Sequence, residues 1–304
     1  MSWLNRDIIN VNDFSKEELE YLFNVADRFI DLKYKEILKG KIIANLFLEP
    51  STRTRISFEV AAKRLGAEVI NVTGEYSSIK KGESLHDTLK MLDTYCDMIV
   101  IRSPIEGSAQ FAADVCENPV INAGDGTLNH PTQAMIDLYT IRNVFSRLDN
   151  LNIGVYGDLK YGRAVISFLM AITKYDNKIY AISPPQLTLR EEVKDELISK
   201  GAKIEEITNL DQVISELDVL YVTRIQKERF VDLAEYEKVK GSYKVDLKSL
   251  EKSKPNLIVM HPLPRVEELT YELDKTSKQA YFRQAKYGIP LRMALLSLIL
   301  GAEV

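Results

Sequence analysis

The chain has 304 residues, 45% of them hydrophobic, and a formal net charge of −4. This length predicts two domains of about 150 residues each, and the slightly acidic balance gives no reason to bind nucleic acid. We expect a soluble cytoplasmic protein, because no apolar run reaches the roughly 18 residues of a membrane span and the first residues do not form a signal peptide.

Strands and helices alternate through the first half of the chain. The apolar run 41–49 ends at Glu49-Pro50 and predicts a buried strand. Helical periodicity follows, and its apolar face is expected to hold Ile56, Val60, Ala61 and Leu65. The alternation then predicts strands at 67–72, 97–102 and 119–123, and helices at 84–95, 108–116 and 131–145.

The polar segment 146–150 precedes a new strand at 151–157, so we place the domain junction near it. The second half is expected to hold helices at 162–174 and 189–200 and strands at 178–183, 202–207, 218–223 and 256–261. Such alternation predicts parallel sheets with helices on both faces. The predicted fold class is therefore α/β, with two doubly wound parallel-sheet domains and a C-terminal helix packing back on the first. The predicted domains are residues 1–148 with helix 289–304, and residues 149–288.

The stretch from Ser51 to Arg55 places hydroxyl groups and two arginines at the start of a helix. Ser51 is a natural N-cap, and the first helical N–H groups have no partner within the helix. The helix dipole and the two guanidinium groups add positive charge, which favours a phosphate. The alternative is a capped surface helix with solvated arginines. A nucleotide is disfavoured, because the chain lacks the G-x-x-x-x-G-K-[ST] loop.

Further polar residues fall where strands end, which is where ligands bind in open α/β sheets. Arg102 ends one predicted strand, and His130 and Gln133 stand at the start of the helix 131–145. His130 could instead be a local cap. Lys81 lies in a polar loop whose charges could simply be solvated, and His86 is expected to be a surface or structural residue within a helix.

The second half carries a second group of such residues. The glycines at 154, 157 and 162 miss the spacing of a dinucleotide-binding turn, and no acidic residue follows the next strand, so we reject NAD. Arg163 and Arg224 follow separate strands, which suggests a clamp for a dicarboxylate, although each could be a salt-bridge partner. In "HPLPR", residues 261–265, two prolines predict a stiff loop whose carbonyl groups can face a ligand.

The chain contains two cysteines, Cys96 and Cys116. They are too few for a disulfide framework, and without a Cys/His cluster they predict no metal site. We expect both to pack as buried apolar side chains.

Six motifs occur along the chain in the order "STRTRISFE", "KKGES", "HPTQ", "DLKYGR", "RIQKER" and "HPLPR". Because of these motifs, the chain resembles the aspartate/ornithine transcarbamoylase family over nearly its whole length. Within it they are most similar to aspartate carbamoyltransferase catalytic chains, because of the proline in "HPLPR" and the lysine in "KKGES". One departure is Ala164, where the best-known bacterial members have threonine. We expect it to remove at most a secondary contact.

The resemblance implies transfer of a carbamoyl group from carbamoyl phosphate to L-aspartate, in pyrimidine biosynthesis, without a metal or other cofactor. The implied catalytic residues are Arg53, Thr54, Lys81, Arg102, His130 and Gln133. Those implied to bind carbamoyl phosphate are Ser51, Thr52, Arg53, Thr54, Ser77, Lys81, Arg102, His130, Gln133, Leu263 and Pro264. Those implied to bind aspartate are Lys81, Arg163, Arg224 and Gln226.

The resemblance also implies a homotrimer with sites shared between chains, and in many prokaryotes a separate zinc-bearing regulatory chain in an allosteric complex. Two other functions stay open at this point. One is transfer to another amino acid, such as ornithine. The other is a phosphate-binding protein of this fold without catalytic activity.

Overall fold

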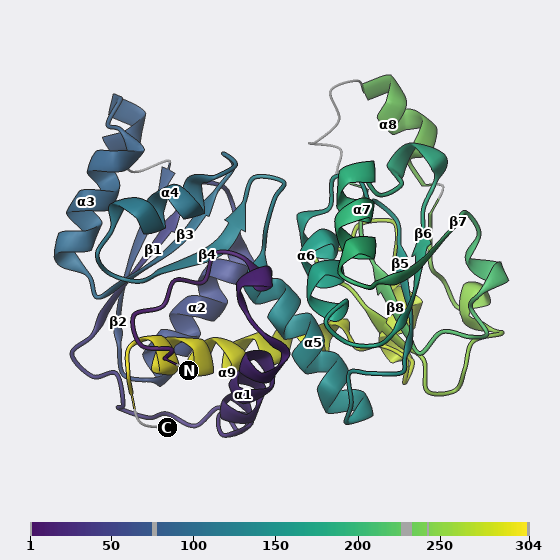
Figure 1. The fold of residues 1–304 in the computed structure, drawn as a ribbon, viewed down its shortest axis with the longest axis horizontal. Helices are drawn as coiled ribbons and strands as arrows, with labels where there is room; N and C mark the ends of the chain where they lie inside the picture. The colour runs from purple at the N-terminus through teal and green to yellow at the C-terminus, as the bar shows by residue number, and fades with distance from the viewer. Residues whose placement is uncertain (1, 75–77, 226–232, 242, 303–304) are drawn as a thin grey trace. The chain divides into compact units, whose positions relative to one another are not determined.

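The computed structural model describes residues 2–74, 78–225, 233–241 and 243–302. The chain forms two compact units (Figure 1). Unit 1 is Met1–Ile136 with Lys286–Val304, and unit 2 is Asp137–Ala285. Each unit contains one parallel sheet, which confirms the predicted class of two doubly wound parallel-sheet domains.

The sheet of unit 1 has four strands in the order β2-β1-β3-β4, all parallel. Their bounds are Ile42–Phe47 for β1, Glu68–Thr73 for β2, Met98–Ser103 for β3 and Val120–Asp125 for β4. After β1 the chain continues to β2 on one side of the sheet, and after β3 it continues to β4 on the opposite side. The two connections therefore separate at the carboxyl ends of β1 and β3, the position where ligands bind in open α/β sheets.

Alternate residues of these strands face opposite layers of helices. Ala44 and Leu46 of β1 share a buried cluster with Leu89 of α3 (Leu85–Tyr95) and Ala112 of α4 (Ser108–Val115). Figure 1 shows α2 (Thr52–Arg64) and α9 (Tyr281–Ile299) on the other side of the sheet. The prediction for the buried face of α2 was partly wrong: Ile56 is 43% exposed, and Phe58 lies inside instead.

Helix α1 (Lys16–Asp27) was not predicted from the sequence. Its start carries a clear signal, however, because Ser15 accepts a hydrogen bond from the Glu18 N–H while the Glu18 carboxylate accepts one from the Ser15 N–H. This reciprocal capping box satisfies two backbone donors that would otherwise have no partner. The helix buries Leu19, Leu22 and Phe23.

The sheet of unit 2 has five parallel strands in the order β7-β6-β5-β8-β9. Their bounds are Asn152–Tyr156 for β5, Lys178–Ile182 for β6, Lys203–Ile207 for β7, Val219–Val222 for β8 and Ile258–Met260 for β9. After β5 the chain continues to β6 on one side of the sheet, and after β8 it continues to β9 on the opposite side. The second point of separation therefore lies at the carboxyl ends of β5 and β8.

Both faces of this sheet are covered. On one face, Phe168 of α6 (Arg163–Ile172) stacks on Tyr221 of β8 with ring centroids 4.6 Å apart. On the other, Tyr156, Leu220 and Val259 share a buried cluster with Val245 and Leu269 from the irregular segments that follow β8 and β9. Helices α7 (Glu191–Ser199) and α8 (Leu233–Val239) complete the α-helices described in this unit.

Helices α5 (Pro131–Phe145) and α9 each pass from one unit into the other. Helix α9 begins at Tyr281, earlier than the predicted residue 289, and contains Pro290 in its interior. A proline is typical of a first helical turn, which explains the late prediction. In unit 1, the Arg292 guanidinium lies 4.7 Å from the Phe58 ring centroid and the Asn5 N–H donates to the Ile299 carbonyl at 2.9 Å. The predicted return of the C-terminal helix to the first domain is confirmed.

The remaining helical elements in the described residues are short 3-10 turns. They are η1 (Val11–Asp13), η3 (Ser78–Lys81), η4 (Pro185–Leu187), η5 (Leu210–Gln212), η7 (Lys248–Leu250) and η8 (Tyr271–Lys275). Across the described part of the chain, every helix is too short or too polar to cross a membrane.

Candidate active site

The predicted phosphate-binding residues of unit 1 lie where β1 passes into α2. Ser51 occupies the predicted N-cap position in an extended conformation, although its side chain makes no capping hydrogen bond. Thr52 and Arg53 are exposed, and Thr54 is 8% exposed. The start of α2 also lacks acidic residues, so the partial positive charge of the helix end is not offset within its first turn.

The second arginine of this stretch, Arg55, pairs with a carboxylate of its own helix. Its guanidinium Nη1 lies 3.5 Å from Oε2 of Glu59, one helical turn further along α2. Lys63 contacts the same carboxylate at 2.8 Å. The charge of Arg55 is therefore largely compensated by a neighbour on the same helix face.

Arg102 stands beside this helix start because of strand register. It is aligned with Phe47, the last residue of β1, and the Leu48 N–H donates to the Arg102 carbonyl at 2.8 Å. Its Nη2 lies 2.7 Å from Oε1 of Glu49, and its Nη1 donates to the Ala123 carbonyl at 3.3 Å. The register of β1 and β3 thus brings an oriented guanidinium to the point where their connections separate.

The turn from β4 into α5 adds His130 and Gln133 to the same edge of the sheet. The His130 carbonyl accepts hydrogen bonds from the N–H groups of Gln133 and Ala134, at 3.0 and 3.3 Å, so its backbone starts the helix. Its side chain is 6% exposed, while that of Gln133 is half-buried. The local-cap role weighed for His130 is therefore met by its backbone carbonyl group.

The other residues weighed in the first half, Ser77, Lys81 and His86, come after β2 in the chain. Lys81 is the last residue of η3 and is exposed, and Ser77 lies outside the described residues. His86 lies on α3 with its side chain 54% exposed and Nδ1 3.0 Å from the Asp87 carboxylate. The prediction that His86 is a surface residue is confirmed.

In unit 2, two predicted arginines follow the two strands at which the connections separate. Arg163 is the first residue of α6, directly after the turn that follows β5, and is 8% exposed. Arg224 follows β8, the neighbour of β5, and is half-buried. Gln226 lies outside the described residues. Ala164, the residue that departs from the family pattern, is half-buried in the first turn of α6.

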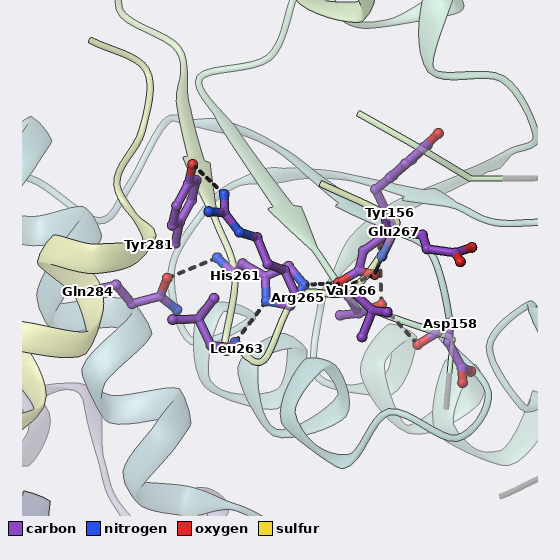
Figure 2. Close-up of polar contacts among 11 residues, drawn as sticks. Tyr156, Asp158, His261, Leu263, Arg265, Val266, Glu267, Tyr281 and Gln284 are labelled. Atoms are coloured by element: carbon purple, nitrogen blue, oxygen red, sulfur yellow. Dashed lines mark hydrogen bonds and ion pairs between the residues drawn. The ribbon is translucent and has the colours of Figure 1, made fainter. Parts of the chain in front are cut away.

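The close approach of these two connections depends on a glycine. Gly157 has a φ of +118°, and a Cβ atom there would lie 2.3 Å from the Thr223 carbonyl oxygen. Asp158, seen in Figure 2, then shapes the turn by accepting hydrogen bonds from the N–H groups of Lys160 and Tyr161 at 3.2 and 2.9 Å. The Asp158 side chain therefore holds the turn that leads to Arg163.

Strand β9 leads into the third loop of this sheet edge, which contains Leu263 and Pro264. Leu263 has a left-handed φ of +59°, and the Leu263–Pro264 peptide bond is cis. The Leu263 N–H donates to His261 Nδ1 at 2.7 Å (Figure 2). The structure therefore describes a stiff loop at the place where the sequence predicts one.

Several buried polar residues near this loop were not predicted. His261 contacts Glu268 through Nε2 at 2.8 Å, and Gln284 joins the His261 backbone to Asp137. The two members of the first pair stand seven positions apart in a loop without periodicity, so no pattern in the sequence signals their contact. Among the described residues, the structure contains no group of three or more His, Cys, Asp and Glu residues placed to hold a metal ion.

Two family models match the chain. Residues 6–143 match the carbamoyl-P binding domain of aspartate/ornithine carbamoyltransferase, and residues 149–299 match its Asp/Orn binding domain. The chain belongs to the aspartate/ornithine carbamoyltransferase family. The family recognised in the sequence motifs is therefore confirmed.

Other members of the family are similar along the whole chain. The aspartate carbamoyltransferase catalytic subunit of Hyperthermus butylicus is 55% identical, over 99% of this chain and 98% of that protein. The catalytic subunit of M. jannaschii aspartate transcarbamoylase has a TM-score of 0.89 at 46% identity, covering 96% of this chain and 97% of that one. Trypanosoma cruzi aspartate transcarbamoylase in complex with carbamoyl phosphate and aspartate has a TM-score of 0.93 at 37% identity, covering 98% of both chains.

Proposed function

We propose that this chain transfers the carbamoyl group of carbamoyl phosphate to the amine of L-aspartate, forming N-carbamoyl-L-aspartate and phosphate in pyrimidine biosynthesis. The observation that carries this proposal is the strand register that sets Arg102 beside the start of α2. It joins an anion-binding helix end to a guanidinium at the point where ligands bind in such sheets. The full-length similarity to aspartate carbamoyltransferase catalytic subunits supports the choice of reaction.

In the proposed site, Ser51, Thr52, Arg53 and Thr54 bind the phosphate group. Their hydroxyl and guanidinium donors add to the partial positive charge of the α2 N-terminus, which lacks acidic residues in its first turn. Lys81 and Ser77 complete the binding of this group from a neighbouring chain.

Thr54, Arg102 and His130 donate to the carbonyl oxygen of the carbamoyl group. Negative charge develops on that oxygen as the amine attacks, so donors that are already oriented lower the barrier. The ion pair with Glu49 and the bond to the Ala123 carbonyl orient Arg102 for this purpose. Gln133 orients the amino group of the carbamoyl unit, and the carbonyl groups of Leu263 and Pro264 accept hydrogen bonds from it.

Arg163, Arg224 and Gln226, together with Lys81, bind the two carboxylates of aspartate. Arginine suits this task because its planar fork can form two parallel hydrogen bonds with one carboxylate. The placement of Arg163 and Arg224 after the adjacent strands β5 and β8 supports the assignment.

In this reaction these groups stabilise the developing oxyanion and position the two reactants. The neutral amine of aspartate forms a bond to the carbamoyl carbon, and the carbonyl electrons move to oxygen. When they return, the bond from carbon to the phosphate oxygen breaks, and the departing phosphate takes the proton from the amine. Holding both reactants in place contributes much of the rate enhancement.

The proposal extends to organisation. Residues 1–148 with helix 289–304 form the carbamoyl-phosphate-binding domain, and residues 149–288 form the aspartate-binding domain. The chains assemble as a homotrimer that shares its sites and can join a zinc-bearing regulatory chain in an allosteric complex. We place the protein in the cytoplasm, where its two cysteines would stay reduced.

One assay tests the activity. Purified protein is incubated with carbamoyl phosphate and either aspartate or ornithine, and the products are separated and identified. We expect carbamoyl-aspartate and no citrulline. Citrulline formation would instead identify an ornithine enzyme, and binding of carbamoyl phosphate without transfer to any amino acid would identify a binding protein.

A further inference from the structure

The loop that follows β9 contains a buried pair of a histidine and a carboxylate that no step of the proposed reaction uses. His261 is 2% exposed and Glu268 is 7% exposed. The His261 Nε2 atom lies 2.8 Å from Oε1 of Glu268. Burying a carboxylate is costly unless hydrogen bonds compensate it, so this pair requires a structural or functional reason.

The hydrogen bonds of His261 determine which ring nitrogen carries the proton. The Leu263 N–H donates to Nδ1 at 2.7 Å, so Nδ1 must be unprotonated (Figure 2). The proton therefore lies on Nε2, which donates to the Glu268 carboxylate. His261 is thus neutral and joins the Leu263 backbone to Glu268.

Glu268 closes the other end of the same loop. Its carboxylate accepts hydrogen bonds from the N–H groups of Val266 and Glu267 at 3.2 and 3.1 Å. Burial alone would raise its pKa, but the hydrogen bond from His261 and those from the backbone outweigh burial and hold the pKa below its usual value. The two side chains therefore fasten residues 262–267 from both ends.

A second set of buried contacts fixes the base of the loop. The His261 N–H donates to Gln284 Oε1 at 2.9 Å, and Gln284 Nε2 donates to Asp137 Oδ1 at 2.6 Å. The Tyr221 hydroxyl donates to the other oxygen of Asp137 at 2.9 Å. These bonds tie the His261 backbone to α9, α5 and β8, while its ring is held by the bonds of Nδ1 and Nε2 to Leu263 and Glu268.

Leu263 adopts a conformation that a leucine rarely takes. Its φ of +59° is left-handed, and such a residue persists only where its surroundings hold it. The bond from its N–H to His261 provides that support. The orientation of the Leu263 and Pro264 carbonyl groups therefore depends on the pair formed by His261 and Glu268.

We propose that His261 and Glu268 are positioning residues, which hold the Leu263 and Pro264 carbonyl groups so that they accept hydrogen bonds from the carbamoyl amino group. This inference rests on the proposed function. A carbonyl oxygen can only accept, so a loop held in this way favours a ligand with an amino group over one with a methyl group at the same place. The pair thus contributes to the selection of carbamoyl over acetyl compounds.

The test compares two inert ligands of the same charge and shape. Phosphonoacetamide carries the amino group, and acetonylphosphonate has a methyl group in its place. Calorimetry gives their dissociation constants for the wild-type chain, where we expect about a tenfold preference for the amide. Glu268→Gln should reduce this preference to less than about twofold, because its NH2 group must face either the His261 Nε2–H or the Glu267 N–H, donor to donor.

The methyl ligand separates positioning from general damage. Its affinity should change by less than about twofold in Glu268→Gln, because it makes no hydrogen bond to the loop. Glu272→Gln is the matched control, since Glu272 is exposed in the nearby turn η8, and it should keep the full preference. If Glu268→Gln does not fold, His261→Asn replaces it, because asparagine can still accept from the Leu263 N–H but is too short to reach Glu268.

Each outcome decides one question. A variant that keeps the tenfold preference, or that binds both ligands equally more weakly, refutes the positioning role and leaves the proposed function intact. A wild-type chain that binds neither ligand refutes the proposed function itself, and the inference with it.

Discussion

The guanidinium Nη2 of Arg102 lies 2.7 Å from the Glu49 carboxylate, and both side chains are 15% exposed. Glu49 is the last residue before Pro50 and the stretch proposed to bind phosphate, and Arg102 is aligned with the end of β1. The contact therefore joins the two connections that separate at this edge. Its effect is to fix the direction of one donor while placing a negative charge near the proposed anion site.

Arg102→Ala should lower kcat by about 10²–10³, because it removes one donor to the developing oxyanion. Folding should be kept, since the side chain is only partly buried. Steady-state kinetics and a thermal melt check both parts. A kcat within threefold of the wild type would rule out the role given to Arg102.

Glu49→Gln should tighten the binding of inorganic phosphate about threefold, because a negative charge near the helix start is removed. It should also lower kcat, since Arg102 loses the ion pair that orients it. Calorimetry at low salt measures the first effect, and 0.5 M salt should reduce it. Arg55→Gln is a useful comparison, because Arg55 already pairs with Glu59 and its removal should affect phosphate less than removal of Arg53.

The sequence predicted the sheets and the places of most site residues because both depend on local signals. Buried parallel strands are continuous apolar runs, and the polar residues that follow them must lie at one edge of the sheet. Arg102, His130 and Arg163 were placed at strand ends in this way, and the structure describes them there.

What the sequence could not predict depends on contacts between distant residues. The ion pair of Arg102 with Glu49 and the hydrogen bond from Gln284 to Asp137 produce no periodic pattern in the sequence, because each depends on how strands and helices pack. The face of α2 was also misjudged, since Ile56 and Phe58 are equally apolar and only packing shows that Phe58 is the buried one.

Asp274→Asn should lower stability by about 1 kcal/mol near neutral pH. Arg265 holds the Asp274 carboxylate with two bonds of 2.5 and 2.6 Å, and this contact lowers the pKa of Asp274. A carboxylate with a lowered pKa stabilises the fold above its unfolded pKa, and the contribution is lost as the pH falls through the folded value. Urea unfolding from pH 7 to pH 3 should show the difference from wild type shrinking below about pH 4. Glu272→Gln, an exposed carboxylate in the same turn, should show no such difference.

Both cysteines should react slowly with iodoacetamide in the native protein at pH 7.5. Burial, and to a smaller extent Asp93, raise the pKa of the Cys116 thiol to about 11, and burial raises the pKa of Cys96. The reactive thiolate of Cys116 is then about one molecule in three thousand. Mass spectrometry should find rapid labelling of both residues only in urea. Native labelling at the rate of glutathione would contradict the burial of these thiols.

The shared site proposed for the homotrimer predicts complementation between two inactive variants. Arg53→Ala and Lys81→Ala should each be nearly inactive, because each removes one contribution to every site. In a mixed ring, one interface brings an intact Arg53 to an intact Lys81 from the next chain. Random reassembly of equal amounts should therefore recover about a quarter of wild-type activity, since about three quarters of the trimers are mixed and each has one complete site in three.

The experiment dissociates the two variants together, reassembles them and measures carbamoyl-aspartate formation. Each variant taken alone through the same steps is the control, and it should stay inactive, because every interface in such a trimer carries the same defect. If the site lay within one chain, every chain of the mixture would keep its own defect and no activity would return. An inactive mixture in which mass spectrometry detects hybrid trimers would therefore refute the sharing of sites, while the roles of Arg53 and Lys81 in the chemistry would still stand on the single variants.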